Sequence, residues 1–152
     1  MDVREAILEQ LVSTAGGIDG VTSVFRNNIT VDETDLPAIV VLDGDEVADE
    51  GDPVGRGPLA PRRMTMTPQI LIILPSSQRE VGTNLNAFRA LLIHAVTDDD
   101  TLTALTTNGR GVRLQQTQTN LAWGRSMKGE MSVQFEIPYT LRPDQLVEEV
   151  TA

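Results

Sequence analysis

Residues Met64–Leu74 read MTMTPQILIIL and run into Pro75. The even-numbered positions of this stretch are apolar, and in its first half they alternate with threonine and glutamine. A period of two predicts a strand with one buried face. From Ile70 onward the odd positions are apolar as well, which predicts a place in the middle of a sheet. Because Pro68 cannot donate a ladder hydrogen bond, we expect it at a bulge or where pairing lapses.

The other segments supply the partners of this strand. Two helix-like periods, over 1–15 and 77–97, carry apolar stripes, and an Asp98–Asp100 run precedes a short third helix. Further strands are expected over 21–25, 37–42, 112–119 and 131–141. The order α-β-β-β-α-β-β predicts an α+β fold of two layers, with a mixed or antiparallel sheet of about five strands and two main helices on one face. We expect a single domain over 1–142 and an acidic C-terminal tail over 143–152.

Composition excludes several classes of protein and of binding site. The chain has 152 residues, 40% of them apolar, which fits one globular domain with a core. The net charge of −10 argues against a surface that grips nucleic acid. The absence of cysteine excludes disulfides and thiolate metal sites. The apolar run Ile70–Pro75 is far shorter than a membrane span, and we expect neither a membrane partner nor a signal peptide.

The segment 43–63 differs from the rest of the chain. Its first half is crowded with acids, and its second half holds prolines, glycines and arginines. Such a composition buries little apolar surface, so we expect a mobile loop between two strands that acts as a docking arm. The alternative is a solvated acidic loop without a role. The interface candidates of this segment are Asp43, Asp45, Glu46, Arg56, Arg62 and Arg63.

No constellation of residues predicts catalysis. The lone histidine, His94, falls away from the apolar stripe of its helix and is predicted to be a surface residue. An EF-hand loop starting at Asp43 fails, because its fifth and twelfth positions are valines. We therefore expect no enzyme activity, no metal and no cofactor. Trp123 is either a local packing plug or an interface residue, since tryptophan is enriched at interface hot spots.

Several pieces of the chain resemble one family. They are VREAILEQLV, GVTSVF, LPAIVV with the following DGDE, ILIILP, LNAFRALLIHAV, DDDTLTAL and SVQFEIPYTL, in that order. The order and hydrophobic pattern are similar to those of the tail terminator proteins of long-tailed bacteriophages, the lambda-type minor tail proteins. The most characteristic part is Leu36-Pro37, Ile39, Val41 and Gly44-Asp45-Glu46. The resemblance covers about residues 1–142.

The resemblance implies a structural subunit of the virion, without catalytic residues, that is assembled in the host cytoplasm. Such subunits form a hexameric ring that caps the tail tube, stops its growth and meets the head-tail connector or head completion protein. DNA passes through the bore without specific binding, and we expect acidic bore walls that repel it. Three alternatives stay open: another neck protein, a metal-dependent enzyme, and a small regulatory binding domain.

Overall fold

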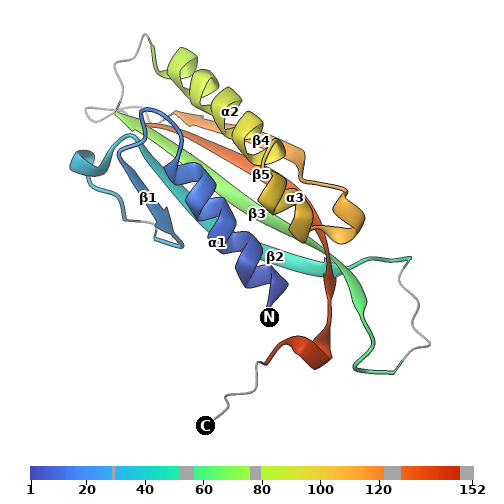
Figure 1. The fold of residues 1–152 in the computed structure, drawn as a ribbon. Coiled ribbons are helices and arrows are strands. Elements are labelled where there is room, and N and C mark those ends of the chain that lie inside the picture. The colour runs from blue at the N-terminus through green and yellow to red at the C-terminus, as the bar shows by residue number, and fades with distance from the viewer. Residues whose placement is uncertain (29, 52–56, 76–79, 122–127, 148–152) are drawn as a thin grey trace.

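The computed structural model describes residues 1–28, 30–51, 57–75, 80–121 and 128–147. It has the predicted α+β architecture of two layers, with a five-stranded sheet on one side and the helices on the other (Figure 1). None of the described helices is long and apolar enough to cross a membrane.

The sheet has the strand order β1-β2-β3-β5-β4, so the segment around Met64–Leu74 is its central strand, as predicted. The first two strands pair in parallel, and every other neighbouring pair is antiparallel. The sheet is therefore mixed. The strands are β1 (Ser23–Arg26), β2 (Ala38–Ala48), β3 (Arg62–Pro75), β4 (Arg113–Leu121) and β5 (Lys128–Leu141).

The helices α1 (Val3–Gly16), α2 (Val81–Thr97) and α3 (Asp100–Leu105) all lie on one face of the sheet (Figure 1). Asp2 caps α1, and its carboxylate accepts from the backbone N–H groups of Arg4 and Glu5. Asp99 caps α3 in the same way through the N–H of Leu102. The same Asp99 carboxylate accepts from Gln10, so it also ties α3 to α1. Three 3-10 turns, η1 (Glu33–Asp35), η2 (Thr107–Gly109) and η3 (Pro143–Gln145), complete the described elements.

The core lies between the sheet and the helices. Along β5 the odd-numbered side chains from Met131 to Tyr139 are buried, while their even-numbered neighbours lie on the other face. The largest fully buried side chains are Tyr139 and Phe135, and aliphatic residues from α1, α2, β2 and β3 surround them. Gly129 is required where α2 begins, because a Cβ at this position would lie 2.0 Å from a Val81 methyl group.

The predicted mobile loop over 43–63 is wrong at both ends. Strand β2 continues to Ala48, and β3 already begins at Arg62, so residues 43–48 and 62–63 belong to the sheet. The acidic composition misled the prediction, because Asp43 and Glu46 are held in β2 by side chains that are distant in the sequence. Residues 52–56 lie outside the described part of the chain.

The expectation for Pro68 is confirmed. The register between β2 and β3 shifts between Leu42 and Asp45, opposite this proline, and pairing of β3 with β5 lapses between Met66 and Gln69. The tail is also more regular than expected at its start. Residues Pro143–Gln145 form η3, and the N-terminal ammonium group of Met1 donates to the carbonyl of Gln145 at 2.6 Å.

Candidate interaction surface

A bulge at Asp43–Gly44 shifts the register of the outer part of β2 against β3. Gly44 has φ +69°, and a Cβ there would lie 2.3 Å from the carbonyl oxygen of Thr67. Only glycine fits both the backbone conformation and this close approach. Beyond the bulge, the strand segments Asp45–Ala48 and Arg62–Thr67, with the described residues 49–51 and 57–61 between them, form what we call the hairpin end of the sheet. Figure 1 shows this end extending past the helical layer.

Arg26 fixes the root of the hairpin end. Its Nε lies 2.9 Å from Oδ1 of Asp43, and its Nη1 lies 2.7 Å from Oε1 of Glu5. Its Nη2 bonds both carboxylates, so one guanidinium joins β1, β2 and α1. These charge-assisted hydrogen bonds hold the pKa of the Glu5 carboxyl and that of the Asp43 carboxyl below their usual values. They also raise the pKa of Arg26.

A second polar contact holds β2 just beyond the bulge, at Glu46. The hydroxyl of Tyr139, on β5, donates to the carboxylate of Glu46. Burial raises the pKa of Tyr139, and the hydrogen bond to Glu46 raises it further. Arg4, on α1, donates to the carbonyl of Gly44 at 2.8 Å, and its Nε lies 3.6 Å from Glu46. The hairpin end is therefore tied to both layers of the molecule.

The structure separates the interface candidates into four groups. Asp43 and Glu46 are engaged in the internal contacts above, whereas the side chain of Asp45 is exposed on the face of the sheet opposite the helices. Arg62 and Arg63 lie in β3, opposite Leu141 and Thr140 of β5. Arg56 and Trp123 lie outside the described residues.

The face without helices, which we call the open face, carries a neutral polar band. Gln69, Gln134 and Gln116 lie side by side across β3, β5 and β4. Ser132 and Gln118 form the next row on β5 and β4. Glutamine and serine side chains accept and donate hydrogen bonds without carrying charge, so this band can meet water or another surface without electrostatic preference.

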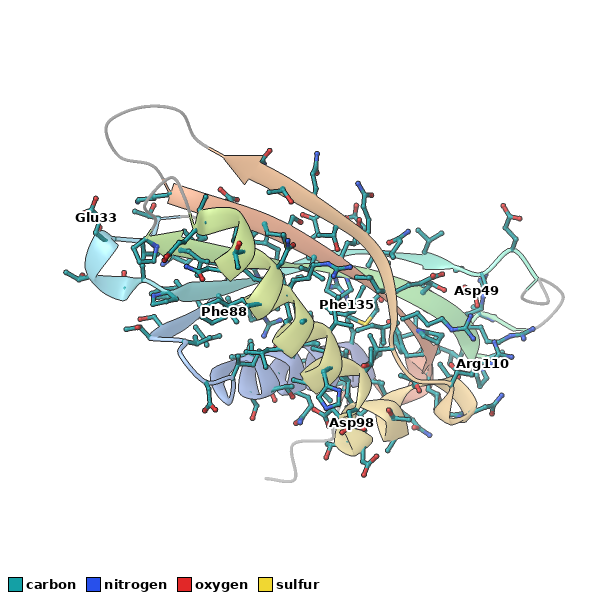
Figure 2. The ribbon with its side chains drawn as sticks, turned by 90° about the horizontal axis from the view of Figure 1, so that it is seen from above. Glu33, Asp49, Phe88, Asp98, Arg110 and Phe135 are labelled. Atoms are coloured by element: carbon teal, nitrogen blue, oxygen red, sulfur yellow. The ribbon has the colours of Figure 1, made fainter. Side chains whose placement is uncertain are left out.

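A charged hollow interrupts the open face at the hairpin end. It measures about 490 Å³ and is lined by Asp49, Thr65, Arg110, Arg113, Glu136 and Pro138. Figure 2 shows Asp49 and Arg110 at this same end of the sheet, far from Glu33. Neither Arg110, which stands between two glycines, nor Arg113 is among the predicted interface residues. No local sequence pattern indicates their position, because it depends on the pairing of β4 with β5.

The lone histidine lies on the surface, as predicted. The side chain of His94 is 81% exposed, and Asp98 lies 4.0 Å from it. No group of three or more His, Asp or Glu residues in the described ranges could hold a metal ion.

No protein-family model matches this chain. No curated protein matches it either.

Proposed function

We propose that this chain is a tail terminator subunit of a long-tailed bacteriophage. Copies of it form a ring, in the hexameric form that the resemblance implies, which caps the tail tube and stops its polymerisation. The ring then offers a surface to the head-tail connector. The order of sequence pieces supports this proposal, and the two-layer fold agrees with the α/β subunit that the resemblance implies.

The observation that carries the proposal is the hairpin end. The base of its β2 strand is held to the body by Arg26, Arg4 and Tyr139. The hairpin end exposes apolar side chains, with Val47 67% exposed and Leu59 64% exposed. Val47 lies on β2, whereas Leu59 lies in the turn between β2 and β3. Exposed apolar side chains beside charged ones are typical of a protein-binding surface.

The neutral band on the open face fits a ring through which DNA passes. Proteins grip DNA through lysine and arginine contacts with phosphates. The band of Gln69, Gln134, Gln116, Ser132 and Gln118 has no such groups. We place this face toward the bore, where it would let DNA slide. The band is neutral rather than acidic, so this proposal replaces repulsion by weak, non-specific contact.

Tube capping tests the proposal. Tail tube protein is polymerised with and without the purified chain, and tube lengths are measured by electron microscopy. We expect short tubes ending in a ring, with the chain present only at tube ends. Unchanged tube lengths and no bound chain would contradict the proposal, and co-sedimentation with filled heads instead would indicate another neck protein.

A hairpin variant sharpens the test. Replacing residues 50–62 by Asn-Gly leaves Asp49 and Arg63 to close a two-residue turn, and their backbones are already hydrogen-bonded at 2.9 Å. Glu46 keeps its contact with Tyr139, so we expect an unchanged fold. We expect tube capping to be lost, because Leu59 and its neighbours are removed. The matched control is Leu91→Ser, which removes an exposed leucine from α2 instead.

A further inference from the structure

Strand β4 is an unprotected edge of the sheet. It is the last strand in the order, and no described strand pairs with its outer side. Natural edge strands are protected from pairing by lysine, proline, charged side chains, β-bulges or a covering segment. Strand β4 has a bulge between Leu114 and Gln116, but residues 116–121 beyond it contain no proline and no charged residue, and from Gln116 to Asn120 all side chains except that of Thr117 are exposed. Such an edge is suited to pair with another strand.

The opposite edge of the sheet is formed by β1. Residues of β1 lie at the same level as residues of β4, where level means the position along the strand direction. The strand register connects Arg26 through Val41, Ile70 and Val133 to Thr117 on the far side of the sheet. By the same route, the level of Val24 is that of Thr119. If a second copy extended the sheet without a shift, β4 would run antiparallel to β1.

The backbone directions match as well. The N–H of Asn27 donates to Val41 and that of Ser23 to Pro37, so the intervening Val24 and Arg26 direct their backbone groups outward. The same alternation, followed across the ladder, directs the backbone groups of Thr117 and Thr119 outward from β4. The unshifted arrangement therefore brings donors and acceptors of the two edges opposite one another.

Charges beyond the end of β1 favour the same arrangement. Strand β1 stops at Arg26, and this leaves the outer part of β2 uncovered, with exposed Asp45 and Glu50 near it. Arg113 lies on the open face near the level of Asp45. Asp45 pairs with Thr67 and Arg113 with Glu136, and the neighbouring pair Met66–Ile137 connects the two strands between them. Within the described residues, neither Arg113 nor Asp45 has an ion-pair partner.

We propose that β4 of one copy pairs antiparallel with β1 of the next, and that Arg113 reaches Asp45 of that next copy. The contact uses two different surfaces of each subunit, so it is head-to-tail and closes into a ring when each step adds the same rotation. The inference rests on the proposed function for its choice of a second copy as the occupant. To the proposed ring it adds which two edge strands pair, in which register, and which charged side chains meet.

Charge reversal tests the pairing. The variant Arg113→Glu would bring two carboxylates together at each interface, and Asp45→Arg would bring two guanidinium groups together, so each variant alone should be monomeric in sedimentation velocity. A 1:1 mixture restores opposite charges at every interface of an alternating ring. We expect the mixture to recover rings of the wild-type sedimentation coefficient, and the double variant in one chain to do the same.

A backbone variant tests the strand pairing independently. Thr119→Pro removes an outward N–H from an edge strand, a position at which proline is tolerated by the fold. We expect an unchanged melting temperature within a few degrees and at least a tenfold loss of ring affinity. The control Arg142→Glu reverses an exposed arginine away from both edges and should assemble normally.

The outcomes separate this inference from the proposed function. Rings in every single variant, or no recovery in the mixture, would overturn the pairing even if the wild type caps tubes. A wild-type chain that stays monomeric at every concentration and with tubes present would overturn it too. If rings are lost in each single charge variant and recovered in the mixture, but do not bind tail tubes, the pairing is supported and the proposed function is contradicted.

Discussion

Arg26 and Asp43 face each other across β1 and β2 with two hydrogen bonds, of 2.9 and 3.1 Å, while the same guanidinium also binds Glu5 of α1. One side chain therefore joins the edge strand, the bulged strand and the helical layer. This relationship explains why the hairpin end is part of the fold although its composition resembles that of a loop.

Substituting Arg26 by glutamine should destabilise the protein. Two carboxylates would lose their charged donor, and we expect a loss of about 1–3 kcal/mol in the free energy of unfolding. Urea unfolding at pH 7 measures it. The control Arg142→Gln, at an exposed position, should change stability by less than about 0.5 kcal/mol. Equal stability of both variants would show that the Arg26 contacts contribute little.

Acid should weaken the same cluster. The pKa values of Glu5 and Asp43 are lowered in the folded state, so their contribution is present above the unfolded pKa of about 4 and is lost as pH falls through the folded values. We expect stability to fall from about pH 4 downward. In Asp43→Asn this acid-dependent loss should be smaller, while Asp19→Asn, at an exposed position, should follow the wild type. Identical acid limbs in all three proteins would contradict this account.

Alkali should act through Tyr139. Its pKa is raised in the folded state, so the folded form keeps a proton that the unfolded chain loses above about pH 10. Stability should therefore decrease as pH rises past this value. Tyr139→Phe should cost about 1 kcal/mol at pH 7, because Glu46 loses a hydrogen bond, and should reduce the alkaline decrease. Thermal melts at pH 7 and pH 10.5 measure both effects.

The bulge gives a prediction about the backbone. Gly44→Ala introduces a Cβ that meets the Thr67 carbonyl at 2.3 Å on a residue with φ +69°, and we expect a loss of about 2 kcal/mol or more. The matched control is Gly82→Ala in α2, where the added Cβ meets nothing within 4 Å. That variant should gain about 0.5–1 kcal/mol from reduced chain entropy. A tolerated alanine at position 44 would mean that the bulge is not needed.

Much of the fold could be predicted from sequence because its signals are local. The alternation in β3 and β5, the Asp2 and Asp99 caps and the lapse at Pro68 each depend on a few neighbouring residues. The extent of β2 could not be predicted, because Asp43 and Glu46 are stabilised in a strand by partners far away in the chain, Arg26 and Tyr139.

The candidate surface was predictable only in part. Asp45 was identified from the acidic cluster, but its position opposite Thr67 on the open face follows from the bulge. Arg113 gave no signal, since a lone arginine before a glutamine-rich strand is ordinary. Its relation to Asp45 emerges only from the pairing order of four strands, which the sequence does not specify by any local pattern.

The most direct measurement is electron microscopy of tail tubes assembled with the purified chain. The account predicts closed rings of this chain at tube ends, with growth arrested there. A chain that remains monomeric and leaves tube length unchanged would contradict it.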